Sequence, residues 1–244
     1  MCSECGFPSH AGHMTGCTRA FPLEEAPSGS VDEEAFFDLY KNNYGFVKSF
    51  NEGTEPHLFV IKDNNGQVVA GAAIEIQQAG ELKEAYFRMK VVRPDYESKG
   101  LAQRLTQRRI ETAKAAGCQT AWAMVGKELP KALRTIFKDG FTISESSTPD
   151  NTDYRVSLDL TKLETRKITI HEALSAAEVR SEDDITGEKI LIPYKETTLI
   201  NTALEQGYVG KQLFLPKDWL ETNPHTETFL YFEKSQSTTQ GSPE

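Results

Sequence analysis

A strand-like run that leads through a glycine-bearing loop into an amphipathic helix is the feature that most constrains this chain. The stretch MKVVRPDYESKGLAQRL, residues 89–105, ends its apolar part before Pro94 and reaches Gly100 through a short polar loop. From Gly100 to Ala116, apolar and small residues recur at steps of three and four, which predicts an amphipathic helix. A buried strand that feeds a helix in this way is typical of a sheet covered by helices.

The other patterns predict a mixed α/β sheet with helices packed on it. Two β-rich runs flank Asp63, Asn64, Asn65 and Gly66, a sequence typical of a hairpin turn. Ser30, followed by acidic residues, is a favourable start for a helix. The expected elements are a helix at 31–50, a hairpin at 57–76, a strand at 84–92, the helix at 100–116, a strand at 118–125, a helix at 127–140, and strands at 141–146 and 153–160.

The region after Leu160 repeats part of this order. Residues 189–214 have the layout strand, loop, helix, glycine with aromatic residue, and strand, which residues 120–145 also have. A degenerate half-repeat and a chance likeness between two such units are both open interpretations. The expected divisions are a cysteine and histidine segment at 1–22, a linker at 23–30, a main domain at 31–160, an extension at 161–233 and a disordered tail at 234–244.

Composition excludes several classes of protein. The formal net charge is -9, and no long cluster of lysine and arginine offsets it, so the surface as a whole repels nucleic acid. Residues 103–114 are the densest basic stretch, which favours a small polyanion as a ligand of the helix at 100–116. No apolar run approaches the roughly 18 residues of a membrane span. The start of the chain lacks the layout of a signal peptide, so we expect a cytoplasmic protein.

The loop before the helix at 100–116 is a candidate anion site. The first N–H groups of a helix have no partners within it, and with the helix dipole they attract anions. A glycine lets the backbone approach a bound group closely. The loop is therefore a candidate cradle for a phosphate or pyrophosphate, and the alternative is an ordinary turn. The residues concerned are Glu97, Ser98, Lys99, Gly100, Leu101 and Ala102.

This stretch resembles motif A of the GNAT superfamily of acyl-CoA N-acyltransferases, which reads Gln/Arg-x-x-Gly-x-Gly/Ala after a strand ending in a Val-x-Pro run. The matching residues are Val92, Pro94, Tyr96, Gly100 and Ala102. Glu97 departs from the pattern, and its carboxylate would face phosphates unfavourably if it pointed inward. The resemblance covers residues 31–160. It implies a GNAT-like twisted, mostly antiparallel sheet flanked by helices, with the extension resembling a degenerate half of such a unit.

The resemblance also implies a site for acetyl-CoA as the acyl donor. Backbone groups of Val91 and Val92 would bind the pantetheine arm, and the backbone N–H groups from Ser98 to Ala102 would hold the pyrophosphate. Lys99 and Arg104 would add positive charge there, or they are ordinary solvated residues.

Acyl transfer to an amine needs a base for the amine, stabilisation of the thioester oxygen and a proton for the leaving thiolate. The family often uses a glutamate on the central strands as base and a tyrosine on the closing helix as acid. Counting back from Gly140 places Ile136 or Phe137 where that tyrosine is expected, and neither side chain donates a proton. The remaining catalytic candidates are Glu84 and Tyr86, on the strand before the motif.

Strand alternation predicts two faces for this strand. The two expected groups are Glu84, Tyr86 and Arg88 on one face, and Ala85, Phe87 and Met89 on the other. Glu84 is either the base or a solvated charge near a strand end. Tyr40 and Tyr44 are candidates for the acceptor side or are plain core aromatic residues, and Cys118 is expected to pack in the core rather than to act as a nucleophile.

The start of the chain holds a candidate zinc site. Cys2 and Cys5 form a Cys-x-x-Cys pair, and His13 and Cys17 would complete a tetrahedral site for Zn2+, with His10 as the alternative nitrogen ligand. The spacing resembles a slightly lengthened zinc knuckle, which would fold only with metal. The other interpretation is a tail with chance cysteines. Because the segment lacks lysine, docking of a protein is favoured over binding of single-stranded nucleic acid.

Together with the resemblance, these observations predict an acyl-CoA-dependent N-acyltransferase, most simply an N-acetyltransferase, that acts by direct attack of an amine on the thioester. The acceptor would be an amine on a small molecule, a peptide or a protein. Two alternatives stay open. One is a non-catalytic module that binds CoA or another ligand and docks a partner through the zinc segment, and the other is a nucleic-acid-binding zinc protein.

Overall fold

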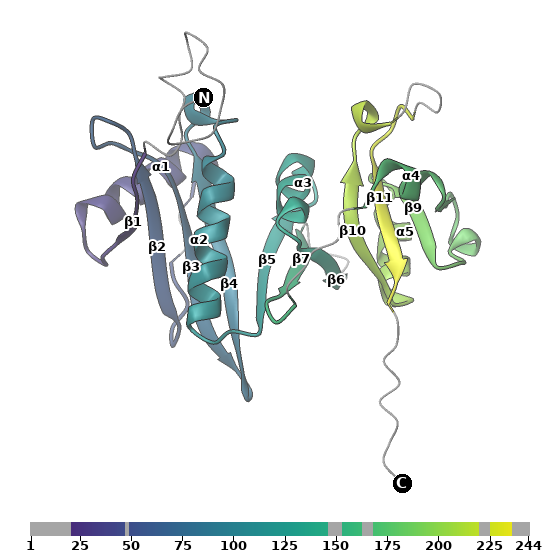
Figure 1. Cartoon of the computed structure of the whole chain (residues 1–244), viewed down its shortest axis with the longest axis horizontal. Coiled ribbons are helices and arrows are strands. Elements are labelled where there is room, and N and C mark those ends of the chain that lie inside the picture. The colour runs from purple at the N-terminus through teal and green to yellow at the C-terminus, as the bar shows by residue number, and fades with distance from the viewer. Residues whose placement is uncertain (1–20, 47–48, 146–152, 163–167, 220–224, 236–244) are drawn as a thin grey trace. The chain divides into compact units, whose positions relative to one another are not determined.

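The chain forms two compact units, Met1–Trp122 and Ala123–Glu244. A computed structural model describes residues 21–46, 49–145, 153–162, 168–219 and 225–235. Each unit contains strands of a sheet and helices that pack on them (Figure 1). The predicted domain limits, with a main domain at 31–160, stay a prediction.

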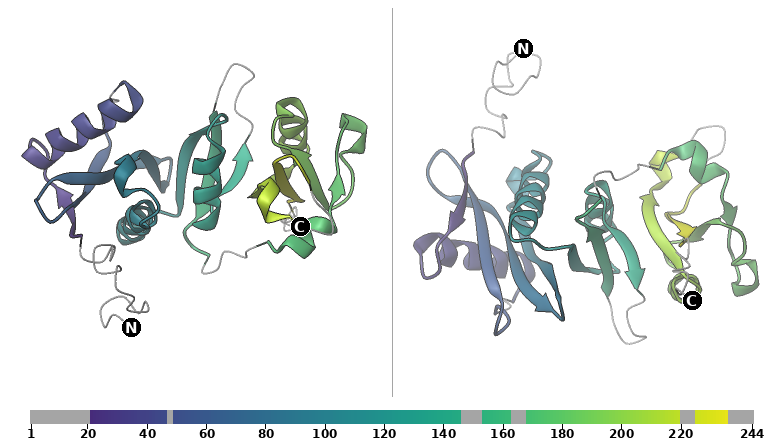
Figure 2. Two further views of the ribbon diagram at one scale, coloured as in Figure 1. Left: turned by 90° about the horizontal axis from the view of Figure 1, so that it is seen from above. Right: turned by 60° about the horizontal axis from the view of Figure 1, so that its bottom comes forward.

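The first unit is a sheet with one long helix on each face. Its strands are β1 Leu23–Ala26, β2 Glu55–Lys62, β3 Val68–Ala79, β4 Leu82–Val92 and the start of β5 Thr120–Gly126. The pairs β1–β2, β2–β3 and β3–β4 are antiparallel, whereas β5 pairs parallel with β4. The helices are α1 Val31–Tyr44, η3 Pro94–Tyr96 and α2 Leu101–Ala115. Helices α1 and α2 lie on opposite faces of the strands (Figures 1 and 2).

The core between α1 and the sheet is built around Phe36, which is fully buried. Leu58, Val60 and Met89 pack in the same cluster. Gly71 of β3 lies under the Phe36 ring, and a Cβ there would collide with that ring. The absence of a side chain at Gly71 therefore lets the helix approach the sheet closely.

Local signals explain where the elements start and end. The Ser30 hydroxyl accepts a hydrogen bond from the Glu33 backbone N–H at 3.2 Å, which confirms it as the cap of α1. The same helix ends at Tyr44, earlier than predicted, because Gly45 takes a left-handed φ of 78° and its N–H bonds back to the Lys41 carbonyl. The hairpin of β2 and β3 forms as predicted. Part of the predicted linker instead forms the edge strand β1.

The second unit has the strand order β5, β7, β6, β10, β11, β9, β8. The remaining strands are β6 Thr142–Glu145, β7 Asp153–Asp159, β8 Ala177–Glu178, β9 Lys189–Pro193, β10 Tyr208–Phe214 and β11 Phe229–Lys234. The helices are α3 Pro130–Lys138, α4 Ile170–Leu174, η4 Glu182–Asp184, α5 Thr197–Glu205 and η5 Pro216–Asp218. The pairs β6–β7, β6–β10, β10–β11 and β9–β11 are antiparallel, whereas β8 pairs parallel with β9.

The predicted likeness of 120–145 and 189–214 has a structural counterpart. The order β5, α3, β6, β7 recurs as β9, α5, β10, β11, and in each set the last strand lies between the other two. The buried positions of the two helices also match. Those of α3 are Leu133, Ile136 and Phe137, and those of α5 at the same offsets are Ile200, Ala203 and Leu204.

The two sets meet through equivalent positions. Ile143 of β6 pairs with Gly210 of β10, and the Tyr194 hydroxyl donates to the Lys127 carbonyl, in both cases across 67 residues. Helix α3 packs on β10 and α5 packs on β6. Such mutual contacts are those of two halves related by an approximate two-fold axis. A Cβ at Gly210 would lie 3.2 Å from the Ile143 Cβ, so the glycine allows this close approach.

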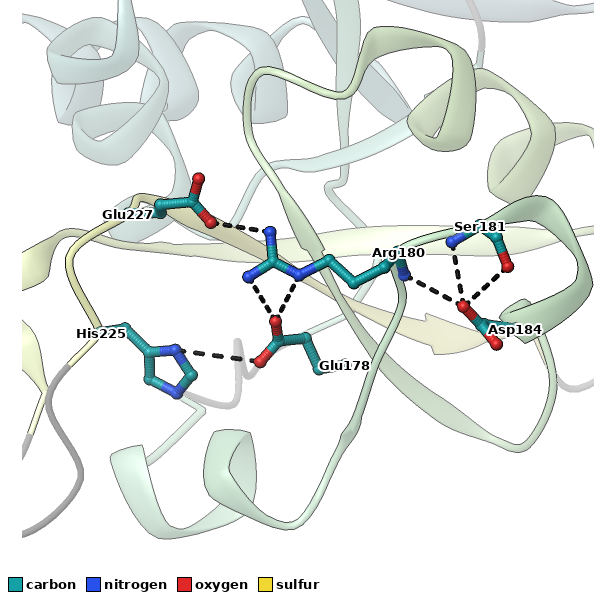
Figure 3. Close-up of polar contacts among 6 residues, drawn as sticks. All are labelled: Glu178, Arg180, Ser181, Asp184, His225 and Glu227. Atoms are coloured by element: carbon teal, nitrogen blue, oxygen red, sulfur yellow. Dashed lines mark hydrogen bonds and ion pairs between the residues drawn. The ribbon is translucent and has the colours of Figure 1, made fainter.

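A polar network covers the edge strand β8 (Figure 3). Arg180 donates to Glu178 and, through Nη1, to Glu227 at 2.8 Å. Asp184 accepts from the Ser181 backbone N–H at 3.0 Å, which closes η4. These charged side chains are exposed and stabilise little by themselves, but they blunt a sheet edge that would otherwise pair with another strand.

In the part of the chain that the structure describes, every helix is too short or too polar to cross a membrane.

Candidate active site

The regular alternation of side chains along β4 is interrupted at Met89. Phe87 lies under the Arg109 guanidinium of α2, with 4.4 Å from Cζ to the ring centroid. Met89 has a φ of 50°, and the register with β3 shifts beside it. As a result, Met89 packs with Phe36 of α1, and Lys90 reaches Thr106 of α2. The prediction that Met89 shares a face with Ala85 and Phe87 is therefore wrong, because a β-bulge interrupts the alternation.

The loop after β4 is anchored to the turn between β2 and β3. The Tyr96 hydroxyl donates to Asp63 Oδ2 at 3.2 Å, while Asp63 Oδ1 accepts from the backbone N–H groups of Asn65 and Gln67. These hydrogen bonds hold the pKa of Asp63 below its usual range, the bond from Gln67 contributing most. Tyr96 thus fixes the start of the loop.

The backbone N–H groups that follow Tyr96 point to an anion site. Ser98 and Gly100 have φ values of 61° and 76°, and Gly100 is the residue before the first turn of α2. The N–H groups of residues 98–102 form no hydrogen bond with any described residue. A Cβ at Gly100 would meet no atom within 4 Å, so the space beside it is open. These features together are those of a cradle for a phosphate group.

Charges around the cradle are mixed. Lys99 Nζ lies 4.3 Å from the centroid of the Tyr96 ring. Arg104, on the first turns of α2, donates to the Phe21 carbonyl at 3.0 Å. Glu97 is exposed and close enough to Tyr44 that its charge adds to the effect of burial in raising the pKa of that phenol. The sequence-predicted loop residues therefore lie together, and Arg104 lies one helical turn after Gly100.

The predicted catalytic residues lie at the other end of β4. Tyr86 stacks on Trp122 of β5, with ring centroids 4.0 Å apart and planes 8° apart. Glu84 precedes it on the same face and pairs with Gln77 and Thr120. A strand rises about 3.3 Å per residue, so Glu84 is roughly 26 Å along β4 from Val92.

Val91 and Val92, the predicted contacts of the pantetheine arm, lie at the end of β4 next to the loop. Both pair with β3, and the Val91 side chain is buried in the core beneath α1. Only their backbone groups are therefore suited to bind a ligand.

Two tyrosines of α1 lie beside the central part of β4. The Tyr40 and Tyr44 rings are 4.7 Å apart, and the Tyr44 hydroxyl donates to the Lys90 carbonyl at 3.3 Å. Burial raises the pKa of Tyr40, and the neighbouring Arg88 charge opposes that rise. The two tyrosines thus flank the central part of β4.

A buried ion pair beside them was not predicted. Glu75 of β3 is fully buried and accepts from Arg88 Nη1, and the Arg88 side chain is 7% exposed. The other carboxylate oxygen of Glu75 accepts from the Asn51 N–H at 3.0 Å and from the Thr54 hydroxyl at 2.8 Å. The signal in the sequence was a glutamate inside the apolar run AGAAIEI, since such a charge needs a partner when buried.

Two further predictions concern the missing tyrosine acid on the closing helix and the cysteine at position 118. Ile136 and Phe137 are buried in α3, so neither offers a proton. Cys118 is 6% exposed, and burial is the main cause of the raised pKa of its thiol. A protonated buried thiol packs as an apolar group and is a poor nucleophile.

The predicted zinc ligands Cys2, Cys5, His13 and Cys17 lie outside the described residues. Within the described ranges, no cluster of three or more histidine, cysteine or acidic side chains is arranged to hold a metal ion.

Comparison with known proteins decides the family. The model of the acetyltransferase (GNAT) family matches residues 18–141, half of the chain, which include β1 to β5, α2 and the cradle. The chain belongs to the GNAT family. Its GNAT fold is mixed α/β, with a large, mostly antiparallel sheet. No curated protein sequence matches the chain.

Solved GNAT structures align with a little over half of this chain. A Klebsiella pneumoniae protein described as a putative acyl-CoA N-acyltransferase is 14% identical, covers 57% of this chain and 97% of its own, and has a TM-score of 0.47. The ribosomal-protein-S18-alanine N-acetyltransferase of Escherichia coli is 19% identical, with 61% and 99% covered and a TM-score of 0.44. Spermidine N-acetyltransferase from Vibrio cholerae, in complex with CoA and spermine, is 16% identical, with 59% and 98% covered and a TM-score of 0.44.

The anchor of the cradle gives a pH-dependent prediction. Asp63→Ala removes three hydrogen bonds to a carboxylate and should lower the free energy of unfolding at pH 7. Because the folded pKa of Asp63 is depressed, this contribution is present above the unfolded pKa and is lost as the pH falls through the folded pKa.

The measurement is denaturant unfolding of both proteins from pH 7 down into the acid range, where the difference should shrink. Asp38→Ala, at an exposed position on α1, is the control and should shift stability by less than about 0.5 kcal/mol. A difference that stays constant with pH would contradict this account of Asp63.

Proposed function

We propose that this GNAT protein is an acetyl-CoA-dependent N-acetyltransferase that acts on an amine of a small molecule, a peptide or a protein. The observation that supports this most directly is the set of backbone N–H groups at 98–102, which bond to none of the described residues and lie at the start of α2 in a GNAT-family domain. They suit the pyrophosphate of CoA, since oriented amides and a helix N-terminus bind phosphates without a dedicated side chain.

The arrangement of donor and acceptor follows from β4. The pyrophosphate lies against Ser98, Gly100 and Ala102, and Lys99 and Arg104 add positive charge on the same side. The pantetheine arm then follows β4 from the backbone of Val91 and Val92 towards Tyr86. This direction brings the thioester to the face that Tyr40, Tyr86 and Arg88 share.

The reaction is a direct transfer. The amine nitrogen attacks the thioester carbonyl carbon, the C–N bond forms, and the C–S bond breaks. The amine gives its proton to Glu84, directly or through the Tyr86 hydroxyl, and the CoA thiolate takes a proton from water. No enzyme nucleophile is needed, which agrees with the buried, protonated state of Cys118.

One observation favours a second candidate function. The closing helix has buried apolar residues, Ile136 and Phe137, where related enzymes often have a tyrosine acid. A GNAT module that binds CoA without turnover would have no need of that acid. Thermal stabilisation by acetyl-CoA without release of free thiol, across a panel of amines, would favour this second function.

We also propose that Cys2, Cys5, His13 and Cys17 bind one zinc ion that orders a docking segment. Four thiolate and imidazole ligands fill a tetrahedral site, so the role would be structural. Metal analysis of the purified full-length protein should find about one zinc per chain, and Cys5→Ser should remove it. Protein that is zinc-free after purification in zinc-containing medium would refute this part of the proposal.

Gly100 gives a test of the cradle. Gly100→Ala and Gly80→Ala both place a Cβ at a positive φ in open space, so each should cost about 1–2 kcal/mol of stability. Only the Gly100 variant puts a methyl group against the bound phosphates. Calorimetric titration with CoA should show affinity lowered at least about tenfold for Gly100→Ala and unchanged for Gly80→Ala. Equal affinities in both variants would remove the cradle from the proposal.

Glu84 gives a test of the base. Glu84→Gln keeps the shape of the side chain but cannot accept a proton, so turnover should fall by about 10²–10⁴-fold while CoA still binds. Glu81→Gln, at the exposed turn between β3 and β4, is the matched control and should leave the rate unchanged. Release of free thiol from acetyl-CoA measures the rate. A normal rate for Glu84→Gln would clear Glu84 of this role and leave Tyr86 as the candidate.

A further inference from the structure

Arg88 has donor groups without acceptors. A guanidinium offers five N–H bonds, and Glu75 accepts through Nη1 alone. The Nε atom is buried and has no hydrogen-bond partner, and Nη2 donates to no described residue. A buried N–H without an acceptor destabilises the folded protein, so such a group calls for an explanation.

A second buried arginine of the same unit shows what a structural role looks like. Arg109 is 2% exposed and donates through Nη1 to the Ala73 carbonyl and through Nη2 to the Thr106 hydroxyl. Both of its terminal nitrogens are engaged by the protein. Among the described residues, Nε of Arg88 and Nε of Arg109 are both buried without a hydrogen-bond acceptor. Arg88 differs at Nη2, which donates to no described residue and is the terminal donor left for another partner.

Glu75 holds the Arg88 side chain in place but accepts from only one nitrogen of its guanidinium. The carboxylate is fully buried and also accepts from Asn51 and Thr54, so both of its oxygens are occupied and it is fixed from two sides. An Arg88 side chain fixed in this way has already lost its rotamer freedom before a ligand arrives, which favours binding.

The groups around Arg88 are aromatic. Its Cζ lies 5.3 Å from the Tyr86 ring centroid, and Tyr86 stacks on Trp122. Tyr40 is close enough for the Arg88 charge to act on it, and Tyr40 also contacts Tyr44. Such rings offer apolar faces to a ligand, so the free edge of Arg88 is a polar group in apolar surroundings.

We propose that Arg88 binds a carboxylate of the acceptor, so that the acceptor is an amine that also has a carboxylate and an apolar body, such as an apolar amino acid or peptide. The planar Nε and Nη2 edge matches a carboxylate with two parallel hydrogen bonds. A monoanion is favoured over a phosphate dianion, because Glu75 already neutralises part of the Arg88 charge and Glu84 lies on the same face. This inference rests on the proposed acyltransferase function and names its acceptor class.

The test measures binding of reaction products, which does not depend on turnover. N-acetylphenylalanine and N-acetylleucine are titrated into the CoA-loaded protein, each beside its neutral amide. Hydrogen bonds to a charged group contribute about 1.5–3 kcal/mol, so each carboxylate should bind about 10- to 100-fold more tightly than its amide. A phosphate analogue without a carboxylate, N-acetylphosphotyrosine amide, should bind no better than the amides.

Three variants decide whether Arg88 is the cause. Glu75→Gln with Arg88→Gln removes both charges together, so that neither is left buried alone, and should reduce the preference to less than about threefold. Arg88→Lys keeps the charge but lacks the planar edge, and should reduce the preference by at least about threefold. Arg108→Gln removes an arginine that is 47% exposed on α2, and should keep the full preference.

The inference is overturned if carboxylate and amide bind equally, if neither binds, if the phosphate binds best, or if the preference survives in the folded double variant and in Arg88→Lys. These outcomes are distinct from failure of the transferase proposal. A clear carboxylate preference without any acetyl transfer would refute catalysis alone. Transfer that is equally fast to amino acids and to their amides would refute the Arg88 site alone.

Discussion

The first N–H groups of α2 have no partners in their own helix, and much of the first unit serves to place them. An α-helix always leaves its first N–H groups unpaired, so these amides must face water, a cap or a ligand. Here neither a side-chain cap nor any other described group takes them. The loop that aims them is tied through Tyr96 to Asp63 at the turn between β2 and β3. The anion site that we propose here would therefore result mainly from backbone geometry, with little help from charged side chains.

Strand β4 connects this anion site with the polar groups further along it. The bulge at Met89 lets Met89 and Val91 pack on α1, while Arg88 before it lies close to Tyr40 of α1 and to Tyr86. Burial of the Glu75 and Arg88 pair is expensive unless its donors and acceptors are satisfied. Glu75 is satisfied and Arg88 is not, and that asymmetry is the physical basis for assigning a ligand to Arg88.

In the second unit, the edge of β6 is covered by a strand of the extension. A short strand with an open edge is liable to pair with another molecule. In this protein β10, from the extension, pairs with β6, and equivalent residues of the two halves meet at Ile143 and Gly210. The extension thus occupies, within one chain, the position that a second copy of the same half would take in a symmetric dimer. Its description as a degenerate GNAT half remains a proposal.

The sequence by itself determined most elements of residues 31–160, because periodicity, Ser30, the turn at Asp63 and Gly100 act on the nearest residues. The edge strand β1 and the early end of α1 at Gly45 were not predicted. The sequence also predicted the loop and the start of α2 at residues 98–102, since a helix start is a local event. Only the tertiary structure decided the bulge at Met89, the partner of Glu75 and the open edge of Arg88. Those depend on which strand lies beside which residue, and no local pattern specifies contacts between residues so far apart in the chain.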